Sequence, residues 1–259
     1  MGRHHRKVGA LIMFRFFAQK EQIEDGCVCI TGEDVNHIRN VLRLKAGEAA
    51  EVVFADRGEV YLCKLRSSAR DRVIFEVKER VEDDAELPVK ITLFQGLPKG
   101  DKMEWIIQKA VELGVFSIVP VSTKYTVVKV DPKKVQHKTE RWNAIALAAA
   151  KQAKRTIIPA VSSPVSFPEA LQMMKELDVA LIAYELDEGG MDRTRECLSR
   201  IRPGDSVGIL IGPEGGFDVK EAEDAGKEGI LQITLGKRIL RTETAGMSVL
   251  SWLGYLLEK

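Results

Sequence analysis

Two glycine-containing segments in the last fifth of the chain have residue types that could hold a small ligand. Residues 211–217 read Ile-Gly-Pro-Glu-Gly-Gly-Phe, and residues 235–244 read Leu-Gly-Lys-Arg-Ile-Leu-Arg-Thr-Glu-Thr. Glycines let backbone amide and carbonyl groups approach a ligand closely, and a proline stiffens the loop that contains it. Both properties suit a flat ligand rich in hydrogen-bonding groups, such as adenosine.

Neither segment is a phosphate-binding loop. The patterns GxxxxGK[ST] and GxGxxG are absent from the sequence, and the carboxylate of Glu214 would repel a phosphate. A carboxylate beside glycines favours a neutral or cationic ligand. The alternative interpretation is a tight turn with a solvated glutamate, because glycine is also the usual turn residue.

The second segment leads into a predicted helix that carries an unusual charge at its start. Thr242 is a natural helix cap, and Glu243 suits the positive end of the helix dipole. Lys237, Arg238 and Arg241 are not explained by capping, since cations are unfavourable at a helix N-terminus. They indicate an anionic partner, either a phosphate or a negative charge that develops during a reaction.

Alternating strands and helices from residue 90 onward would position these segments. Ligands of open α/β sheets bind beyond the carboxyl ends of parallel strands. The loops that begin at 184, 211 and 235 each follow a predicted strand, which places Tyr184 and Glu185 beside the two glycine segments. Apolar runs predict strands at 91–94, 116–121, 179–184, 207–211 and 230–235, and helical spacing predicts helices at 101–113, 133–155, 218–227 and 242–257.

The preceding part of the chain has a different rhythm. Residues 13–85 contain short β-type runs and one helical stretch at 32–42, which together predict a small β-barrel-like domain. The acidic residues 82–88 are interpreted as a linker to a second domain at 86–259. The apolar run within residues 1–12 is too short for a secretory signal, and these residues are interpreted as an N-terminal extension or leader.

Charge and cysteine content restrict the class of protein. The chain has 39 Lys+Arg against 38 Asp+Glu, a net charge of +1, which argues against a general polyanion binder. Residues 86–160 nevertheless hold thirteen basic and six acidic residues, so this block is either a polyanion surface or a solvated helix face. Four cysteines without zinc-site spacing indicate a reduced, intracellular protein without a metal, and no apolar run is long enough to span a membrane.

The paired motifs at 211–217 and 235–245 resemble those of the 16S ribosomal RNA uridine-N3 methyltransferases of the SPOUT superfamily. Further segments agree with this family at 37–43, 99–104, 108–114 and 141–142, and at Gln152 and Arg155. The resemblance implies an N-terminal PUA-like RNA-binding domain and a C-terminal methyltransferase domain with a trefoil knot. It also implies a cytoplasmic homodimer that uses S-adenosylmethionine to methylate 16S rRNA of the 30S subunit.

Site residues follow from the resemblance position by position. It implies that Arg241 and Glu243 are catalytic, and that Lys124 and Lys151 depart from residues common in the family, where Arg and Glu often stand. Residues implied to bind RNA are His37, Arg39, Arg43, Lys99, Lys124 and Arg155. Residues implied to bind the cofactor are Tyr184, Glu185, Ile211, Gly212, Pro213, Glu214, Gly215, Leu235, Gly236, Ile239, Leu240, Thr242 and Thr244.

The mechanistic hypothesis is transfer of a sulfonium-bound methyl group to the N3 atom of an unpaired uridine. The protein would align N3 with the methyl group, and Arg241 would stabilise charge on the uracil oxygens. Glu243 would orient Arg241 or accept the imide proton. Three alternatives remain at this level: a ribose 2′-O-methyltransferase of the same superfamily, a dinucleotide-dependent oxidoreductase, and a non-catalytic RNA-binding protein.

Overall fold

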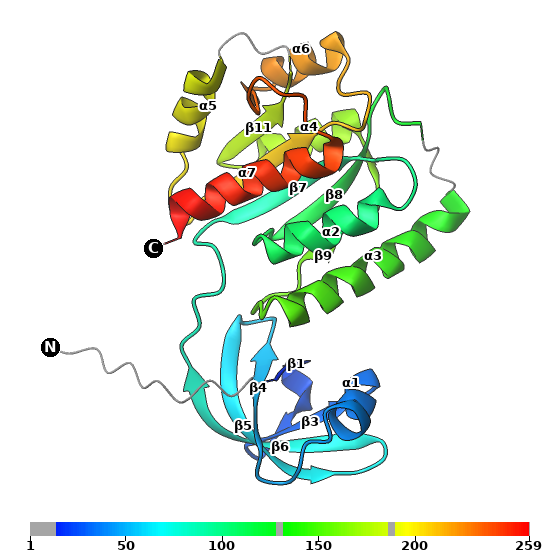
Figure 1. The fold of residues 1–259 in the computed structure, drawn as a ribbon, viewed down its shortest axis with the longest axis vertical. Coiled ribbons are helices and arrows are strands. Elements are labelled where there is room, and N and C mark those ends of the chain that lie inside the picture. The colour runs from blue at the N-terminus through cyan, green and yellow to red at the C-terminus, as the bar shows by residue number, and fades with distance from the viewer. Residues whose placement is uncertain (1–13, 128–131, 186–189, 259) are drawn as a thin grey trace, which may run out of the picture. The chain divides into compact units, whose positions relative to one another are not determined.

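Two units make up the computed structural model, with the division between Ala85 and Glu86. The structure describes residues 14–127, 132–185 and 190–258 (Figure 1).

The first unit is a six-stranded sheet in the order β1-β4-β5-β6-β3-β2. β1 pairs in parallel with β4, and the other neighbours are antiparallel. The strands are β1 (Arg15–Ala18), β2 (Ile23–Glu24), β3 (Cys27–Thr31), β4 (Ala49–Phe54), β5 (Glu59–Ser68) and β6 (Arg72–Val81). A 3-10 turn, η1 (Lys20–Gln22), precedes β2, and α1 (Glu33–Asn36) continues into the π-helical η2 (His37–Val41).

Alternating side chains of these strands form the core of the first unit. Phe16, Ile30 and Phe75 are at most 2% exposed, and Ile38 attaches the helical segment to the same core. The helix predicted at 32–42 is confirmed as α1 and η2, and the short β-type runs expected in residues 13–85 are present as strands.

The second unit is a seven-stranded sheet in which every pairing is parallel. The order is β10-β8-β7-β12-β11-β13, and β9 pairs with β8. The strands are β7 (Lys90–Gly96), β8 (Ser117–Ser122), β9 (Ala160–Val161), β10 (Val165–Ser166), β11 (Val179–Ala183), β12 (Ser206–Ile211) and β13 (Leu231–Ile233). The α/β fold with a parallel sheet is confirmed.

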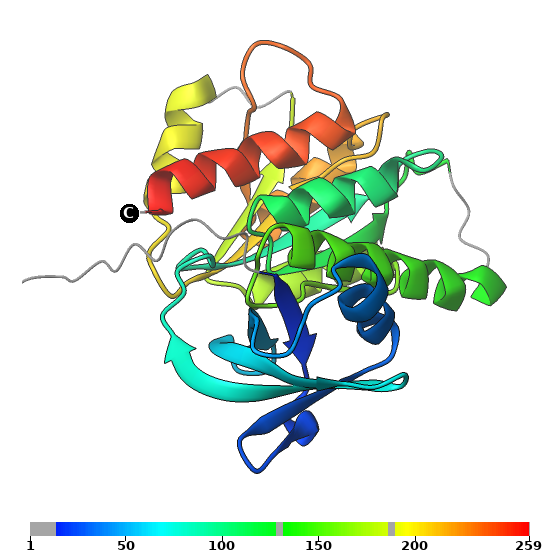
Figure 2. The ribbon, with the colours of Figure 1, turned by 60° about the horizontal axis from the view of Figure 1, so that its bottom comes forward.

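Helices cover both faces of this sheet, as parallel strands require. α2, α3 and α7 lie on one face and α4 and α6 on the other (Figure 1, Figure 2). On the second face, Phe94 and Leu210 of the central strands pack with Met174 of α4 and Ala225 of α6. The helices are α2 (Lys102–Glu112), α3 (Pro132–Gln152), α4 (Phe167–Lys175), α5 (Gly190–Ser199), α6 (Val219–Lys227) and α7 (Thr242–Leu257).

Three details differ from the sequence-based expectations. α2 spans Lys102–Glu112 and is one residue shorter at each end than the helix predicted at 101–113, and the side chain of its N-cap residue Asp101 makes no capping hydrogen bond. α3 ends at Gln152 and not at residue 155, because Lys154 adopts a left-handed φ of 53° and turns the chain back. The interpretation of 82–88 as a linker is wrong at its second half, since Glu86 is hydrogen-bonded to Arg155 and Leu87 is buried within the second unit.

None of the helices in the described ranges is both long enough and apolar enough to cross a lipid bilayer.

Candidate active site

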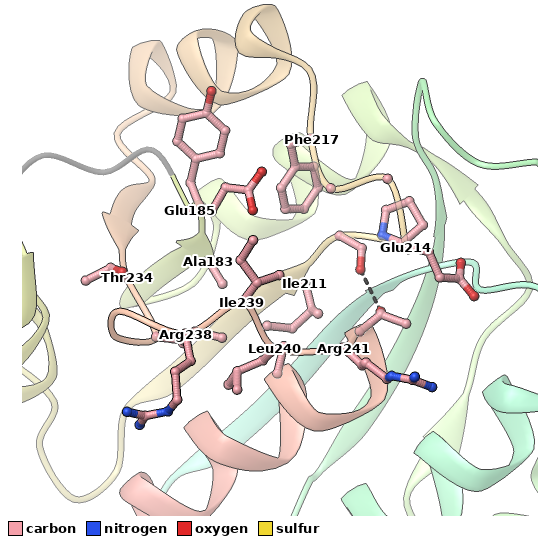
Figure 3. Close-up of a pocket in the computed structure, with 18 of the residues that line it drawn as sticks. Ala183, Glu185, Ile211, Glu214, Phe217, Thr234, Arg238, Ile239, Leu240 and Arg241 are labelled. Carbon is pink, nitrogen blue, oxygen red and sulfur yellow. Dashed lines mark hydrogen bonds between the residues drawn. The ribbon is translucent and has the colours of Figure 1, made fainter.

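A cavity of about 690 Å³ opens where β11, β12 and β13 end and α7 begins (Figure 3). We call it the strand-end cavity. It lies beside the central strands β7 and β12, from which the sheet order departs in both directions, and this is where open α/β sheets bind ligands. Of the predicted site residues, those that line it are Tyr184, Glu185, Ile211, Gly212, Pro213, Glu214, Gly215, Leu235, Gly236, Ile239, Leu240, Arg241 and Thr242.

Further residues complete the lining. Gly216, Phe217, Lys237 and Arg238 belong to the two segments that the sequence singled out. The assignment of site residues missed the lining residues Lys102, Ala183, Thr234 and Ala245. Ala183 and Thr234 stand immediately before predicted site residues at strand ends, which is the signal that could have found them.

The turn after β12 is shaped by its glycines. The N–H of Gly216 donates to the carbonyl of Pro213 at 2.9 Å, and Gly216 has a φ of 67°, which side chains rarely adopt. The turn also lies directly on the end of β7, because a Cβ atom at Gly96 would stand 2.6 Å from the Pro213 nitrogen. Backbone thus rests on backbone, and this wall of the cavity is fixed without large side chains.

Thr242 joins this turn to the start of α7. Its hydroxyl donates to the carbonyl of Gly212 at 2.6 Å and accepts from the Gln95 amide at 2.8 Å, and the residue is 5% exposed. The interpretation of Thr242 as a helix cap is therefore wrong: Arg241 is the N-cap residue and makes no side-chain cap. Thr242 instead holds β7, the β12 turn and α7 in one register.

Glu214 is engaged by groups of the protein itself. Its carboxylate accepts from the Lys99 backbone N–H at 3.1 Å and from Lys102 Nζ at 2.7 Å, and in Figure 3 it points away from Ile211 and Leu240. Partial burial alone would raise the pKa of Glu214, but these hydrogen bonds outweigh it and hold the pKa below its ordinary value. The side chain of Glu214 therefore anchors the turn to the start of α2.

A second carboxylate approaches the same lysine. Glu243 Oε2 is 3.8 Å from Lys102 Nζ, and this buried oxygen has no hydrogen-bond partner among the described residues. The hydrogen bond to Glu214 raises the pKa of Lys102 above its ordinary value, although the nearby charge of Arg241 partly opposes this effect. Lys102, Arg241, Glu214 and Glu243 therefore form one charged cluster at the rim of the cavity.

The remaining walls are apolar. Ile211, Leu240 and Ala245 line the interior, and Ile239 stands at the mouth with 88% of its surface exposed (Figure 3). Backbone groups of glycine loops beside aliphatic side chains fit a purine ring, which is flat, apolar on its faces and polar at its edges. Arg238 points away from this interior (Figure 3).

The structure places other predicted site residues outside the cavity. Thr244 and Glu243 do not line it, and Lys99 contributes its backbone N–H to Glu214. Lys124 forms an ion pair with Asp218 at 2.7 Å, so its ammonium braces the loop after β8 against the start of α6.

Arg155 is 2% exposed and its guanidinium binds Glu86 and the carbonyls of Val111 and Val115. The prediction that Arg155 contacts RNA is contradicted, because no face of this guanidinium is open to a ligand.

The three remaining predicted residues lie in the first unit. His37 and Arg43 are exposed and Arg39 is half-buried, all on or just after η2. The His37 ring contacts the edge of Phe16, with ring centroids 6.4 Å apart. Their role in RNA binding stays a prediction.

Within the described ranges no group of three or more His, Cys, Asp or Glu side chains could hold a metal ion. None of the four cysteines, all of which lie in the described ranges, is joined in a disulfide. Burial raises the pKa of the Cys63 thiol to about 12, so this cysteine is not a nucleophile at neutral pH.

Comparison with known proteins identifies the class. The RNA methyltransferase domain model matches residues 85–254, and the RNA methyltransferase PUA domain model matches residues 30–78. The chain thus has the RNA methyltransferase domain of this class, preceded by the PUA domain that RNA methyltransferases carry.

Individual relatives define the class more closely. The ribosomal RNA small subunit methyltransferase E of Bacillus subtilis is 40% identical over 251 residues, which cover 95% of this chain and 98% of that protein. The same enzyme of Neisseria gonorrhoeae, solved with bound S-adenosyl methionine, superposes with a TM-score of 0.78 at 30% identity, covering 95% of this chain and 98% of the other. The chain belongs to the family of ribosomal RNA small subunit methyltransferase E.

Proposed function

We propose that this protein transfers the methyl group of S-adenosylmethionine to N3 of a uridine in 16S ribosomal RNA. The observation that carries the proposal is the strand-end cavity, whose glycine turns and apolar walls suit the adenosine part of that cofactor. The name of the Bacillus subtilis relative supports the substrate, since that protein is a ribosomal RNA small subunit methyltransferase and its match covers 95% of this chain. The N3 position is the finer part of the proposal and rests on the motif resemblance.

The chain's own residues divide the work of binding. Ile211, Leu240 and Ala245 would contact the faces of the adenine, and the backbone of the β12 and β13 turns would bond its edges. Glu185 is an exposed carboxylate at the rim, suited to ribose hydroxyls or to the ammonium of the methionine part. When bound, S-adenosylmethionine supplies an electrophilic methyl group on a sulfonium.

Arg241 is the residue we assign to charge stabilisation. It is exposed at the rim of the cavity and its guanidinium could donate to a uracil oxygen as N3 loses its proton. Glu243 is assigned to proton acceptance or to orienting Arg241, and its buried Oε2 without a hydrogen-bond partner supports a role that depends on a free lone pair. The target base must be unpaired, because pairing blocks N3.

The two units receive different tasks in this proposal. Residues 13–85 would bind RNA as a PUA-like domain through His37, Arg39 and Arg43, and residues 86–259 would catalyse transfer. A trefoil knot around the β12 and β13 turns, homodimer formation, a 30S substrate and a cytoplasmic location complete it.

The test is transfer of a labelled methyl group to 30S particles and to free 16S rRNA that lack the modification, followed by primer extension. An N3 methyl group blocks pairing and stops the polymerase, whereas a ribose methyl group generally lets it pass. We expect a single stop at a uridine. Absence of transfer to both substrates would overturn the proposal, and transfer without a stop would favour the ribose alternative.

The Arg241→Ala variant tests the assigned chemistry. We expect transfer to fall by at least a hundredfold while calorimetry shows cofactor binding close to that of the unsubstituted protein. Lys220→Ala, which removes an exposed cation of α6 that does not line the cavity, is the matched control and should leave transfer unchanged. Unchanged turnover in Arg241→Ala would remove Arg241 from the mechanism.

A further inference from the structure

A second concave surface lies between α2 and α3, which run side by side (Figure 1, Figure 2). This α2–α3 groove has a volume of about 460 Å³ and shares no lining residue with the strand-end cavity. Its lining residues are Asp101, Glu104, Trp105, Gln108, Ile145, Ala148, Ala149 and Gln152. The proposed methyl-transfer chemistry uses none of them.

Trp105 is the distinctive side chain of this groove. It is 44% exposed, whereas Trp142 of α3 is 5% exposed and belongs to the core. Exposed Gln108 and Gln152 flank it, and their amides can donate and accept hydrogen bonds. An exposed indole beside amides offers a stacking face with polar groups at its edge, which is how proteins hold unpaired bases.

α3 lies within the basic block at residues 86–160 and carries part of its positive charge. Its 21 residues hold five basic side chains and one acidic side chain. Lys134, Lys138 and Arg141 are spaced i, i+4 and i+7, so they share one helix face, and Ile145 and Gln152 continue that face into the groove. Lys134 and Ile145 are eleven residues apart, which is about 16 Å along the helix and a length suited to a few nucleotides.

The charges on this face are not cancelled at its far end. Arg141 binds Glu104 through Nε–Oε1 and Nη2–Oε2 contacts of 2.8 Å, which connect α3 to α2 in the middle of this face. Beyond it Lys134, His137 and Lys138 are exposed, and among the described residues neither lysine has a carboxylate partner. Asp101 is the remaining acidic group of the groove, on the side toward the start of α2.

We propose that the α2–α3 groove and the basic face of α3 bind a single-stranded segment of the RNA substrate. One base stacks on Trp105 between Gln108 and Gln152, and Lys134 and Lys138 neutralise phosphates that follow it. This inference rests on the proposed function, because it assumes an RNA substrate with unpaired bases next to the methylated one. Stacking and charge neutralisation together explain why an aromatic face and a lysine face are continuous here.

The first experiment measures binding of a fluorescein-labelled 16S rRNA fragment that contains the methylated uridine, by fluorescence anisotropy. We expect Trp105→Ala to raise the Kd about tenfold and Trp105→Phe to retain most of the affinity, since phenylalanine still stacks. Met173→Ala, which removes a 43% exposed side chain from α4 on the other face of the sheet, is the matched control. Calorimetric affinity for S-adenosylmethionine should be unchanged in all three variants.

The second experiment tests the charged part by varying salt. Lys134→Gln combined with Lys138→Gln should reduce the slope of log Kd against log salt by about 1.4, because each phosphate contact to a single strand contributes about 0.7. The control pair Lys175→Gln and Lys227→Gln removes the same charge from α4 and α6 and should leave the slope unchanged.

Two outcomes would overturn the groove as an RNA site. One is unchanged RNA affinity in Trp105→Ala while the unsubstituted protein binds and methylates the RNA. The other is conversion of a dimer to a monomer by Trp105→Ala in sedimentation equilibrium, which would make the groove a surface between two copies of the chain. If the unsubstituted protein binds RNA through the groove but methylates none, the proposed function fails and the groove stands.

Discussion

Two glutamates, one at the amino ends and one at the carboxyl ends of the parallel strands, accept hydrogen bonds from similar groups but differ in burial. Glu86 precedes β7 and accepts from Arg155 and from the Thr156 N–H at 2.7 Å, whereas Glu214 follows β12 and accepts from Lys102 and the Lys99 N–H. The Arg155 side chain is 3% exposed and the Lys102 side chain is 36% exposed. Arg155 also spends two donors on backbone carbonyls of α2 and its following turn.

The difference indicates how one interaction serves two purposes. The planar guanidinium of Arg155, whose nitrogens all donate hydrogen bonds, fixes the structure at the amino ends of the strands. Removing either Arg155 or Glu86 would leave a buried charge without its partner. A single ammonium at the solvent boundary fixes the β12 turn weakly and leaves it adjustable. Burial, and not the type of contact, decides whether the pair contributes to stability or to positioning the cavity.

The largest effect is expected from breaking the buried pair. Glu86→Ala should lower the free energy of unfolding of the second unit by about 3–5 kcal/mol, because Arg155 would remain charged and buried without a counter-ion. Urea denaturation measures this loss. Glu112→Ala, which breaks the exposed pair of Glu112 with Lys109, is the control and should change stability little. Equal losses in both variants would show that burial does not separate the two classes of pair.

Thr242→Val separates burial from position, because Thr242 is buried although it lies at the carboxyl ends of the strands. Valine has the same shape, but the carbonyl of Gly212 would lose its donor, at a cost of about 1–3 kcal/mol. Thermal unfolding should show the loss, and calorimetry should show weaker cofactor binding. Thr244→Val, in the exposed first turn of the same helix, is the control. Full stability in Thr242→Val would mean that position at the carboxyl or amino ends of the strands, and not burial, determines how much stability is lost.

Glu214→Gln tests the adjustable turn. The amide oxygen can still accept from the Lys99 N–H, but the ion pair with Lys102 is lost, so we expect the Kd for S-adenosylmethionine to rise about tenfold with little change in unfolding. Glu228→Gln breaks a similar exposed pair, with Lys175 at 2.9 Å and far from the cavity, and should leave the Kd unchanged. A loss of stability without a change in Kd would reverse the roles of the two glutamates.

The smallest effect is a pH dependence. Burial raises the pKa of Glu86, but the hydrogen bonds from Arg155, Thr156 and Ile157 outweigh it and hold the pKa below the ordinary 4.5. The stabilisation is therefore complete above about pH 4.5 and is lost as pH falls through the lower folded value. The difference in unfolding free energy between the unsubstituted protein and Glu86→Gln should shrink below pH 4.5. A constant difference down to pH 3 would contradict this.

Local pattern predicted much of the second unit. α7 runs from Thr242 to Leu257 and β12 reaches Ile211, as the apolar spacing indicated, because helix and strand periods are properties of neighbouring residues. α4 was missed although Ser166 and Glu169 form a capping box around Pro168. That signal is local and could have predicted the helix.

Contacts between distant residues could not be predicted in this way. Arg155 has the residue type of an RNA-binding group, and only its pairing with Glu86, 69 residues earlier, removes it from the surface. Lys102 entered the charged cluster because α2 begins beside the β12 turn. The cofactor loops were found from sequence because glycines mark backbone geometry, whereas ion pairs depend on which chain segments meet.

The hydroxyl of Thr242 also constrains the order in which the molecule can be completed. A ribosome delivers Gln95 and the β12 turn well before residue 242, and neither has its final hydrogen-bond partner until then. A nascent chain that already contains the whole central sheet therefore still lacks the wall that α7 provides. Competence to bind the cofactor should emerge in one late step during synthesis, and chains stalled before residue 242 should fail to bind it.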